Sequence, residues 1–187
     1  LAEVETGKKK GMKTMKRLLT LVLVTAILLP FVLPFTTIAE VAIPEPEAAV
    51  VERFFKQLKD FRVIITSTDY TYEQYDNGLH VFEFEPTEGL MLRILYEEDW
   101  TFDQISTLVD TLKGYAITKS GQIEGSLIMA YCGFDEQTAY DIVLYLTTLI
   151  GKDPYKFHNL EQDGYNFQLW LNPLVGISYN LSISPTK

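Results

Sequence analysis

The longest apolar stretch of the chain is an uncharged run at residues 18–35, which reads LLTLVLVTAILLPFVLPF. Six basic residues precede it, between positions 8 and 17. Apolar side chains partition into hydrocarbon while Lys and Arg stay on the cytoplasmic side, so this order is typical of a secretory signal or an N-terminal membrane anchor. We therefore expect the chain after residue 39 to be secreted or anchored on the outer face of the cytoplasmic membrane.

The ends of this targeting segment, residues 1–39, carry two further signals. Met12 opens a compact basic stretch and is the expected true start, because residues 1–11 are typical of a ribosome-binding region read in frame from a bacterial gene. Thr37 and Ala39 place small residues at the −3 and −1 positions of a cleavage site, which favours cleavage after Ala39. An uncleaved anchor is the alternative, since eighteen residues lie at the short end of what spans a bilayer.

Residues 40–46 contain two prolines and are predicted to be a linker, followed by a single globular domain at residues 47–187. Its first element is a predicted helix over residues 47–59, where apolar side chains recur at helical spacing: Val50, Val51, Phe54, Phe55 and Leu58. Three predicted strands follow, rich in β-branched and aromatic residues, at 61–75, 79–85 and 90–96. Asp76-Asn77-Gly78 and residues 86–89 are turn signals between them, so an antiparallel meander is expected.

Two stripes of apolar residues predict two further helices. Thr101 and Gln104 fit a capping box ahead of a stripe that Gly114 ends, at Phe102, Ile105, Leu108, Val109 and Leu112. Asp135 is the expected cap of the second helix, which Gly151 ends and whose stripe is Ala139, Ile142, Val143, Leu146, Leu149 and Ile150. Between the two, residues 115–119 and 122–131 flank Ser120-Gly121 and predict a hairpin.

The end of the chain is predicted to contain a loop at 152–163 and two strands at 165–171 and 177–183. Residues 90–114 and 126–151 share an apolar segment, an acidic cap and a helical stripe that ends at a glycine. This similarity has two explanations, an internal duplication or chance. The expected fold class is α+β, a mostly antiparallel sheet with helices packed on one face, with two related strand-plus-helix halves if the duplication is real.

Charge and cysteine content narrow the classes of partner. From Glu40 onward the chain has 23 acidic and 10 basic residues, a net charge of about −13. Such a surface repels nucleic acid and anionic lipid heads, so we expect no nucleic-acid partner and membrane contact only through the N-terminal segment if it stays uncleaved. Cys132 is the one cysteine of the sequence, so no intramolecular disulfide can form.

Cys132 is also a candidate nucleophile. Its predicted place between a strand and a helix N-terminus favours a thiolate, and His158 or His80 would serve as its base. The alternative is a buried structural cysteine, which the nearby Asp135 and Glu136 favour because they raise the thiol pKa.

The acidic run Glu97-Glu98-Asp99 supplies carboxylates that could ligate calcium or form a pair for glycoside hydrolysis. Its spacing is not that of an EF-hand loop, and a solvated loop ahead of the helix predicted from Thr101 is the competing interpretation.

Aromatic residues form the third candidate site. Tyr70 and Tyr72 lie on the same face of a predicted strand, and Trp100 follows the acidic run, so these rings could stack on sugars or anchor a protein. Cross-strand packing in the core is the competing interpretation.

The chain has no Gly-rich phosphate loop, no His/Cys metal spacing and no GxSxG elbow, so no cofactor is expected. We expect a non-catalytic domain that binds a protein or a cell-wall glycan through an aromatic-bearing sheet face. The alternative function is an extracytoplasmic hydrolase that uses Cys132 with His158, or a carboxylate pair.

Overall fold

The computed structural model describes residues 41–113, 117–172 and 178–186, and the elements below belong to the compact unit Ala42–Lys187. The apolar run, the expected cleavage site and Met12 lie outside the described residues. In the part of the chain that is described, no helix is both long and apolar enough to cross a membrane.

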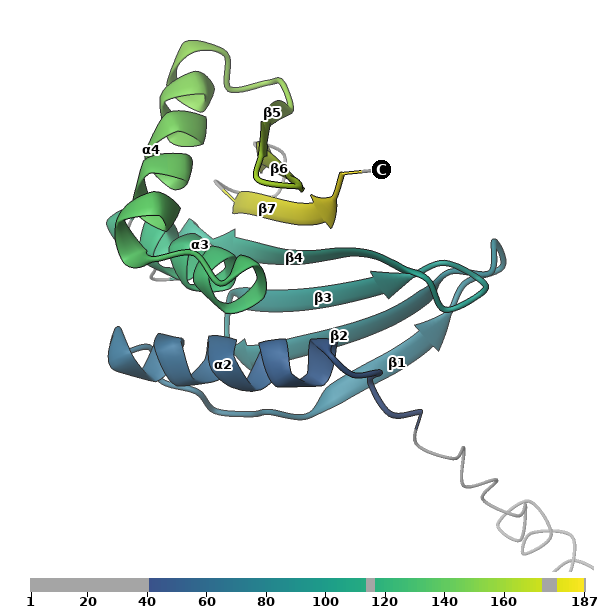
Figure 1. Ribbon diagram of the computed structural model, residues 1–187. Helices are drawn as coiled ribbons and strands as arrows, with labels where there is room; N and C mark the ends of the chain where they lie inside the picture. Colours follow the sequence, from purple (N-terminus) through teal and green to yellow (C-terminus); the bar gives the residue numbers. More distant parts are fainter. Residues whose placement is uncertain (1–40, 114–116, 173–177, 187) are drawn as a thin grey trace, which may run out of the picture. The chain divides into compact units, whose positions relative to one another are not determined.

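A seven-stranded antiparallel sheet forms the centre of the described fold, in the order β1-β2-β3-β4-β7-β6-β5 (Figure 1). The sheet thus consists of two groups of strands that are consecutive in sequence, β1 to β4 and β5 to β7. The two groups meet where β4 pairs with β7. The strands are β1 (Tyr70–Gln74), β2 (His80–Thr87), β3 (Leu90–Tyr96), β4 (Phe102–Asp110), β5 (His158–Gln162), β6 (Tyr165–Asn172) and β7 (Ser178–Pro185).

Three helices, α2 (Glu47–Asp60), α3 (Ile117–Cys132) and α4 (Glu136–Lys152), cover one face of this sheet, and a short 3-10 turn, η2 (Thr111–Lys113), follows β4 (Figure 1). α3 packs between α2 and α4. The predicted α+β class, with helices on one face of a mostly antiparallel sheet, is confirmed.

The two faces of the sheet differ along adjacent rows of paired residues. On the helix side, one row crosses all seven strands with apolar or aromatic side chains: Tyr72, Phe82, Ile94, Ile105, Ile183, Phe167 and Leu160. The neighbouring row on the other face is polar throughout: Thr71, Glu83, Arg93, Ser106, Ser182, Gln168 and Asn159. This alternation places the core between the sheet and the helices and leaves a polar face opposite.

Several predicted elements are confirmed close to their expected bounds. The helix expected at 47–59 is α2, with Phe54 and Leu58 fully buried. The Asp76-Asn77-Gly78 turn joins β1 and β2, with φ of +88° at Gly78, and β3 matches the expected strand at 90–96. Asp135 caps α4, and its carboxylate accepts a hydrogen bond of 2.7 Å from the Thr138 amide. β6 and β7 correspond to the last two predicted strands.

The helix predicted from the Thr101 capping box is wrong, since this segment is β4. Ile105, Thr107 and Val109 are β-branched, alternate along the chain and are all fully buried on one face. The same apolar positions fit a helical stripe, but pairing with β3 on one side and β7 on the other favours the strand. Tertiary context therefore overrides the local cap signal.

The hairpin predicted around Ser120-Gly121 is also wrong, because both residues lie inside α3. Tyr115 and Ala116 fall outside the described residues. The apolar run of α3 at residues 127–131 has no clear period, so the sequence pattern alone does not distinguish a strand from a helix there. Gly121 stands where α3 meets α4: an added Cβ would lie 3.6 Å from the Cγ1 atom of Val143. The glycine belongs to helix packing and marks no turn.

Three smaller predictions need correction. The strand expected at 61–75 is paired only from Tyr70, while the loop expected at 152–163 contains β5. Pro86 belongs to β2, at an irregularity in the β2–β3 register where its carbonyl accepts a 2.7 Å hydrogen bond from the Thr66 amide.

The similarity of residues 90–114 to residues 126–151 does not correspond to similar structure. The first segment contains two strands, β3 and β4, and the second contains the end of α3 and all but the last residue of α4. The two related halves considered from the sequence are therefore not present.

Candidate functional site

Three ring side chains stack at one end of β1 and β2, namely Trp100, His80 and Tyr72, and we call them the Trp100 platform. The indole of Trp100 and the imidazole of His80 have ring centroids 3.9 Å apart and planes inclined by 18°. The Tyr72 ring is nearly parallel to the indole, inclined by 10° with a centroid distance of 6.3 Å. Phe82 and Tyr96 border the same indole at 6.4 and 5.9 Å.

A tight turn between β3 and β4 positions Trp100. The Trp100 amide donates to the Glu97 carbonyl at 2.9 Å, and the Glu97 amide donates to the Thr101 carbonyl at 2.8 Å. Trp100 takes the left-handed position of this turn, with φ of +66°. That conformation costs a residue with a Cβ about 1–2 kcal/mol, and here ring contacts offset the cost. An aromatic residue therefore occupies a position that usually favours glycine.

His80 is the buried support of the platform, with only 4% of its surface exposed. Its Nδ1 atom lies 2.8 Å from the Tyr72 hydroxyl, and its Nε2 atom lies 3.3 Å from the Glu98 carbonyl. A carbonyl oxygen can only accept, so the neutral tautomer with its proton on Nε2 satisfies both contacts, with the tyrosine hydroxyl donating to Nδ1. Both ring nitrogens are thus used in holding the imidazole under the indole.

The outer side of the platform is open to solvent. Trp100 is 41% exposed, even though its indole contacts four other rings. A shallow hollow of about 610 Å³ is lined by the sequence neighbours of Trp100, namely Glu97, Glu98, Asp99 and Thr101. Hydrogen bonds from Thr101 hold the pKa of Asp99 below its ordinary value, so this carboxylate is ionised. The arrangement presents an indole next to carboxylate acceptors.

Of the three aromatic candidates from the sequence, the structure brings Tyr72 and Trp100 together and gives Tyr70 a packing position. The Tyr70 ring contacts Phe82 and Phe84 at centroid distances of 5.6 and 5.3 Å. Tyr70 and Tyr72 share a face, as expected, but it is the face that the helices cover, since Phe84 contacts Phe55 of α2. Trp100 is therefore the residue of this set that a ligand can reach most directly.

Cys132 lies at the C-terminal end of α3, and not between a strand and a helix start. Burial raises the pKa of its thiol to about 12. Burial, and after it the proximity of Cys132, raises the pKa of the Tyr165 hydroxyl, so Cys132 lies near Tyr165. His158 instead pairs with Leu169, four residues further along β6 and roughly 13 Å from Tyr165 at the rise of a strand. The Nε2 atom of His158 is engaged with the Asp153 carbonyl at 2.7 Å. The structure does not bring this thiol and this imidazole together.

The acidic candidates Glu97, Glu98 and Asp99 are all exposed in the turn that carries Trp100. Among the described residues, no group of three or more His, Cys, Asp or Glu side chains is arranged to hold a metal ion. These carboxylates belong to the turn that carries Trp100.

The sequence does not predict the part that His80 plays, because its local pattern suggests only a base for Cys132. His80 and Trp100 are twenty positions apart, and no short-range signal links them. The residue that could have indicated the platform is Trp100 itself, an aromatic residue directly after three acids in a turn-forming stretch.

Comparison with known proteins adds no identity: the chain matches no family, no curated protein and no solved structure.

Proposed function

We propose that this protein is a non-catalytic binding module that contacts a cell-wall glycan through Trp100. The observation that carries the proposal is the exposed indole, held in a left-handed turn and stacked on a buried, doubly hydrogen-bonded imidazole. Residues in sparsely populated backbone regions persist where surrounding contacts hold them, and such positions cluster at binding sites. Pre-organisation lowers the ordering cost of binding, because the ring does not need to be immobilised by the ligand.

The chemistry of the surrounding turn supports a sugar more than an apolar ligand. An indole face offers a flat apolar surface for the C–H groups of a pyranose ring. Glu97 and Glu98 are exposed carboxylates, which accept hydrogen bonds and so match the hydroxyl donors of a glycan. A protein partner is the second candidate for the same residue, because Trp is enriched at the centres of protein interfaces and is exposed here.

The proposed place of action remains outside the cytoplasm, either secreted or tethered to the outer face of the membrane. This part of the proposal rests on the basic and apolar segments between residues 8 and 35.

The hydrolase alternative is the weaker proposal on the present geometry. Burial raises the pKa of the Cys132 thiol, so the reactive thiolate is disfavoured at neutral pH, and His158 is engaged elsewhere. The platform itself holds its imidazole by both nitrogens, which suits a support better than a proton-transfer group.

Co-sedimentation with purified bacterial cell walls tests this function. We expect the wild-type protein to be retained on the walls and Trp100→Ala to lose about tenfold in affinity. Trp170→Ala is the matched control, since Trp170 lies beside Phe157 and away from the platform, and its retention should equal that of the wild type. Equal retention of all three proteins would exclude Trp100 as the contact. Loss of retention after protease treatment of the walls would favour the protein ligand.

A further inference from the structure

Four turns of the chain come together at the Trp100 end of the sheet. Antiparallel pairing places the β1–β2 and β3–β4 turns at one end (Figure 1). The β5–β6 turn lies at the same end, because the end of β7 pairs with the first halves of both β4 and β6. The end of α3 joins them, since the Tyr131 ring contacts Phe102 and Tyr165 at centroid distances of 5.3 and 5.6 Å. The α3–α4 turn is therefore the fourth.

The start of α2 lies at this end as well. The Tyr96 hydroxyl, at the end of β3, donates a hydrogen bond of 3.0 Å to the carboxylate of Glu47, the first residue of α2. Residues 41–46, which precede Glu47, therefore reach the same end. α2 has 14 residues, so its last residue, Asp60, lies about 20 Å away.

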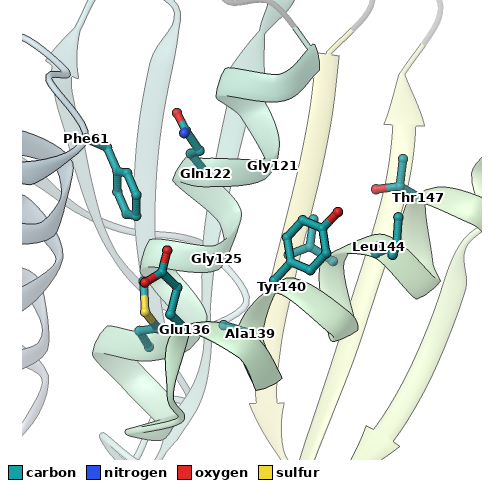
Figure 2. A pocket seen from close by; sticks show the side chains of 11 residues that line it. Phe61, Gly121, Gln122, Gly125, Glu136, Ala139, Tyr140, Leu144 and Thr147 are labelled. Atoms are coloured by element: carbon teal, nitrogen blue, oxygen red, sulfur yellow. The ribbon is translucent and has the colours of Figure 1, made fainter.

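These connecting segments carry charge of one sign, and we call them the acidic pole: residues 41–46, 75–79, 97–101, 133–135 and 163–164. Their exposed charged side chains are all acidic: Glu45, Asp76, Glu97, Glu98, Asp99, Asp135 and Asp163. They contain no Lys or Arg, although ten basic residues follow residue 40. Glu136 extends the pole onto α4, and Figure 2 shows it lining the groove of about 410 Å³ between α3 and α4.

No base of the described chain neutralises the acidic pole. The ion pairs among the described residues join Arg93 to Glu83, Lys113 to Glu88 and Lys156 to Asp153, and all of these residues lie outside the pole. Asp99 is ionised, because hydrogen bonds from Thr101 lower its pKa. Trp100 therefore stands in a segment whose carboxylates are left for a ligand to neutralise.

The platform itself is also suited to a cation. The face of an indole carries partial negative charge and attracts an ammonium group placed over it. The ring stacked on Trp100 adds no positive charge, because the two hydrogen bonds of His80 are satisfied by its neutral tautomer. The exposed indole and the carboxylates of its turn thus favour the same sign of charge.

We propose that the ligand of the Trp100 platform is a glycan whose sugar rings carry ammonium groups. This inference rests on the glycan-binding function proposed above and names its class of sugar. One sugar ring stacks on the indole, where its ammonium group makes a cation–π contact. Ammonium groups of neighbouring sugars pair with the exposed Glu97 and Glu98.

Charge separates this glycan from other polymers of a cell wall. A chain that carries phosphate or carboxylate groups is repelled by the acidic pole before it reaches Trp100. An uncharged sugar stacks on the indole but leaves the carboxylates without a partner. A polymer of amino sugars gains both contacts, and the field of the pole also speeds its approach at low salt.

Calorimetry with two β-1,4-linked oligosaccharides of equal length tests the class of sugar. One consists of glucosamine and the other of N-acetylglucosamine, so they differ in the acetylation that removes the charge of the amino group. At about pH 5.5 protein carboxylates are ionised and the free sugar amines are protonated. The full chain, in an uncharged detergent, is expected to bind the glucosamine form at least about tenfold more tightly in about 0.05 M salt. This ratio should shrink in about 1 M salt, where the Debye length is about 3 Å.

The result also distinguishes this inference from the function on which it rests. Equal affinities for the two oligosaccharides would leave glycan binding standing and overturn the preference for ammonium groups. Binding of neither would contradict both.

Two pairs of charge-removing changes locate the contact. Glu97→Gln with Glu98→Gln should weaken binding of the glucosamine oligosaccharide at least about fivefold, because two exposed ion pairs are lost. Asp60→Asn with Asp69→Asn removes the same charge from exposed positions at the opposite end of α2 and of β1, and should weaken it less than about twofold. Equal losses would show that net charge alone attracts the polymer, and would overturn the site.

An oligolysine with the same number of charges separates a sugar from a basic peptide. It is expected to bind at least about tenfold more weakly than the glucosamine oligosaccharide, because its side chains offer no ring to stack on the indole of Trp100. Equal or tighter binding of the oligolysine would overturn the inference and assign a basic protein segment to the platform.

Discussion

The indole of Trp100 lies almost flat on the imidazole of His80, with centroids 3.9 Å apart, although the two residues are twenty positions apart in the sequence. His80 begins β2, whereas Trp100 ends the turn between β3 and β4. Antiparallel pairing of β2 with β3, which sets His80 opposite Tyr96, brings them together. The platform is thus a product of the sheet register.

The hydrogen bond from Tyr72 to His80 predicts a measurable stability effect. Tyr72→Phe keeps the ring but leaves the Nδ1 atom of a buried imidazole without its donor, so the free energy of unfolding should fall by about 1–3 kcal/mol. Urea denaturation measures this. The matched change Tyr75→Phe removes a hydroxyl from a side chain that is 44% exposed and should alter stability by less than about 0.5 kcal/mol. Equal effects of the two substitutions would show that the Tyr72 hydroxyl does not hold His80.

Two glycines with opposite surroundings predict opposite responses to alanine. Gly125→Ala adds a methyl group in open space within a helix, so stability should rise by about 1 kcal/mol. Gly89→Ala should lower it by at least about 1–2 kcal/mol, because Gly89 has φ of +81° and the new Cβ would lie 2.5 Å from the Cβ of Lys113. Thermal unfolding followed by circular dichroism compares them. A destabilising Gly125→Ala would mean that the space at this position is already filled in solution.

Glu124 predicts the pH dependence of stability. This fully buried carboxyl accepts a 3.4 Å hydrogen bond from the Ser120 hydroxyl, and burial raises its pKa from 4.5 to about 8. Between these values the unfolded state loses its proton while the folded state keeps it, so stability should fall as the pH rises, by at most about 1.4 kcal/mol per pH unit. Below pH 4.5 and above pH 8 this contribution is constant.

Glu124→Gln isolates that contribution. The variant cannot ionise, so the difference in unfolding free energy between variant and wild type should grow from pH 5 to pH 8 and then level off. Glu52→Gln, an exposed change on α2, is the control and should give a constant difference. A constant difference for Glu124→Gln as well would show that Glu124 is ionised within the fold.

Cys132 should react slowly in the folded protein. With its thiol pKa raised to about 12, the thiolate at pH 8 is roughly a thousandfold rarer than for a thiol of the ordinary value, and alkylation by iodoacetamide slows in proportion. Mass spectrometry of the native and urea-unfolded protein over time gives both rates. Fast alkylation of the native protein would restore the cysteine hydrolase as a candidate.

The sequence predicted elements best where local signals and tertiary structure agree. In α2 the apolar stripe of Val50, Phe54 and Leu58 is also the buried stripe, and Asp135 is both the expected and the observed cap of α4. Where one pattern fits two structures, only long-range pairing decides. Ile105 and Val109 suit a helical stripe as well as an alternating strand, and it is β3 and β7 on either side that select the strand.

The candidate site could be predicted only in part for a similar reason. An aromatic residue next to acids in a turn pointed to Trp100, and the face shared by Tyr70 and Tyr72 followed from strand alternation. Which face the helices would cover depended on long-range contacts, such as that of Phe55 on α2 with Phe84 on β2. The support from His80 depended on register, which no local pattern specifies.

Fluorescence titration of the Trp170→Phe variant tests the central claim most directly, because Trp100 is then the only tryptophan of the chain. The probe is soluble glycan strands released from bacterial cell walls. We predict a saturable change in the emission of Trp100, and an affinity at least about tenfold weaker by calorimetry when Trp100 is replaced by Ala. Unchanged emission across the titration, or undiminished affinity in the Trp100→Ala protein, would contradict glycan binding at the platform.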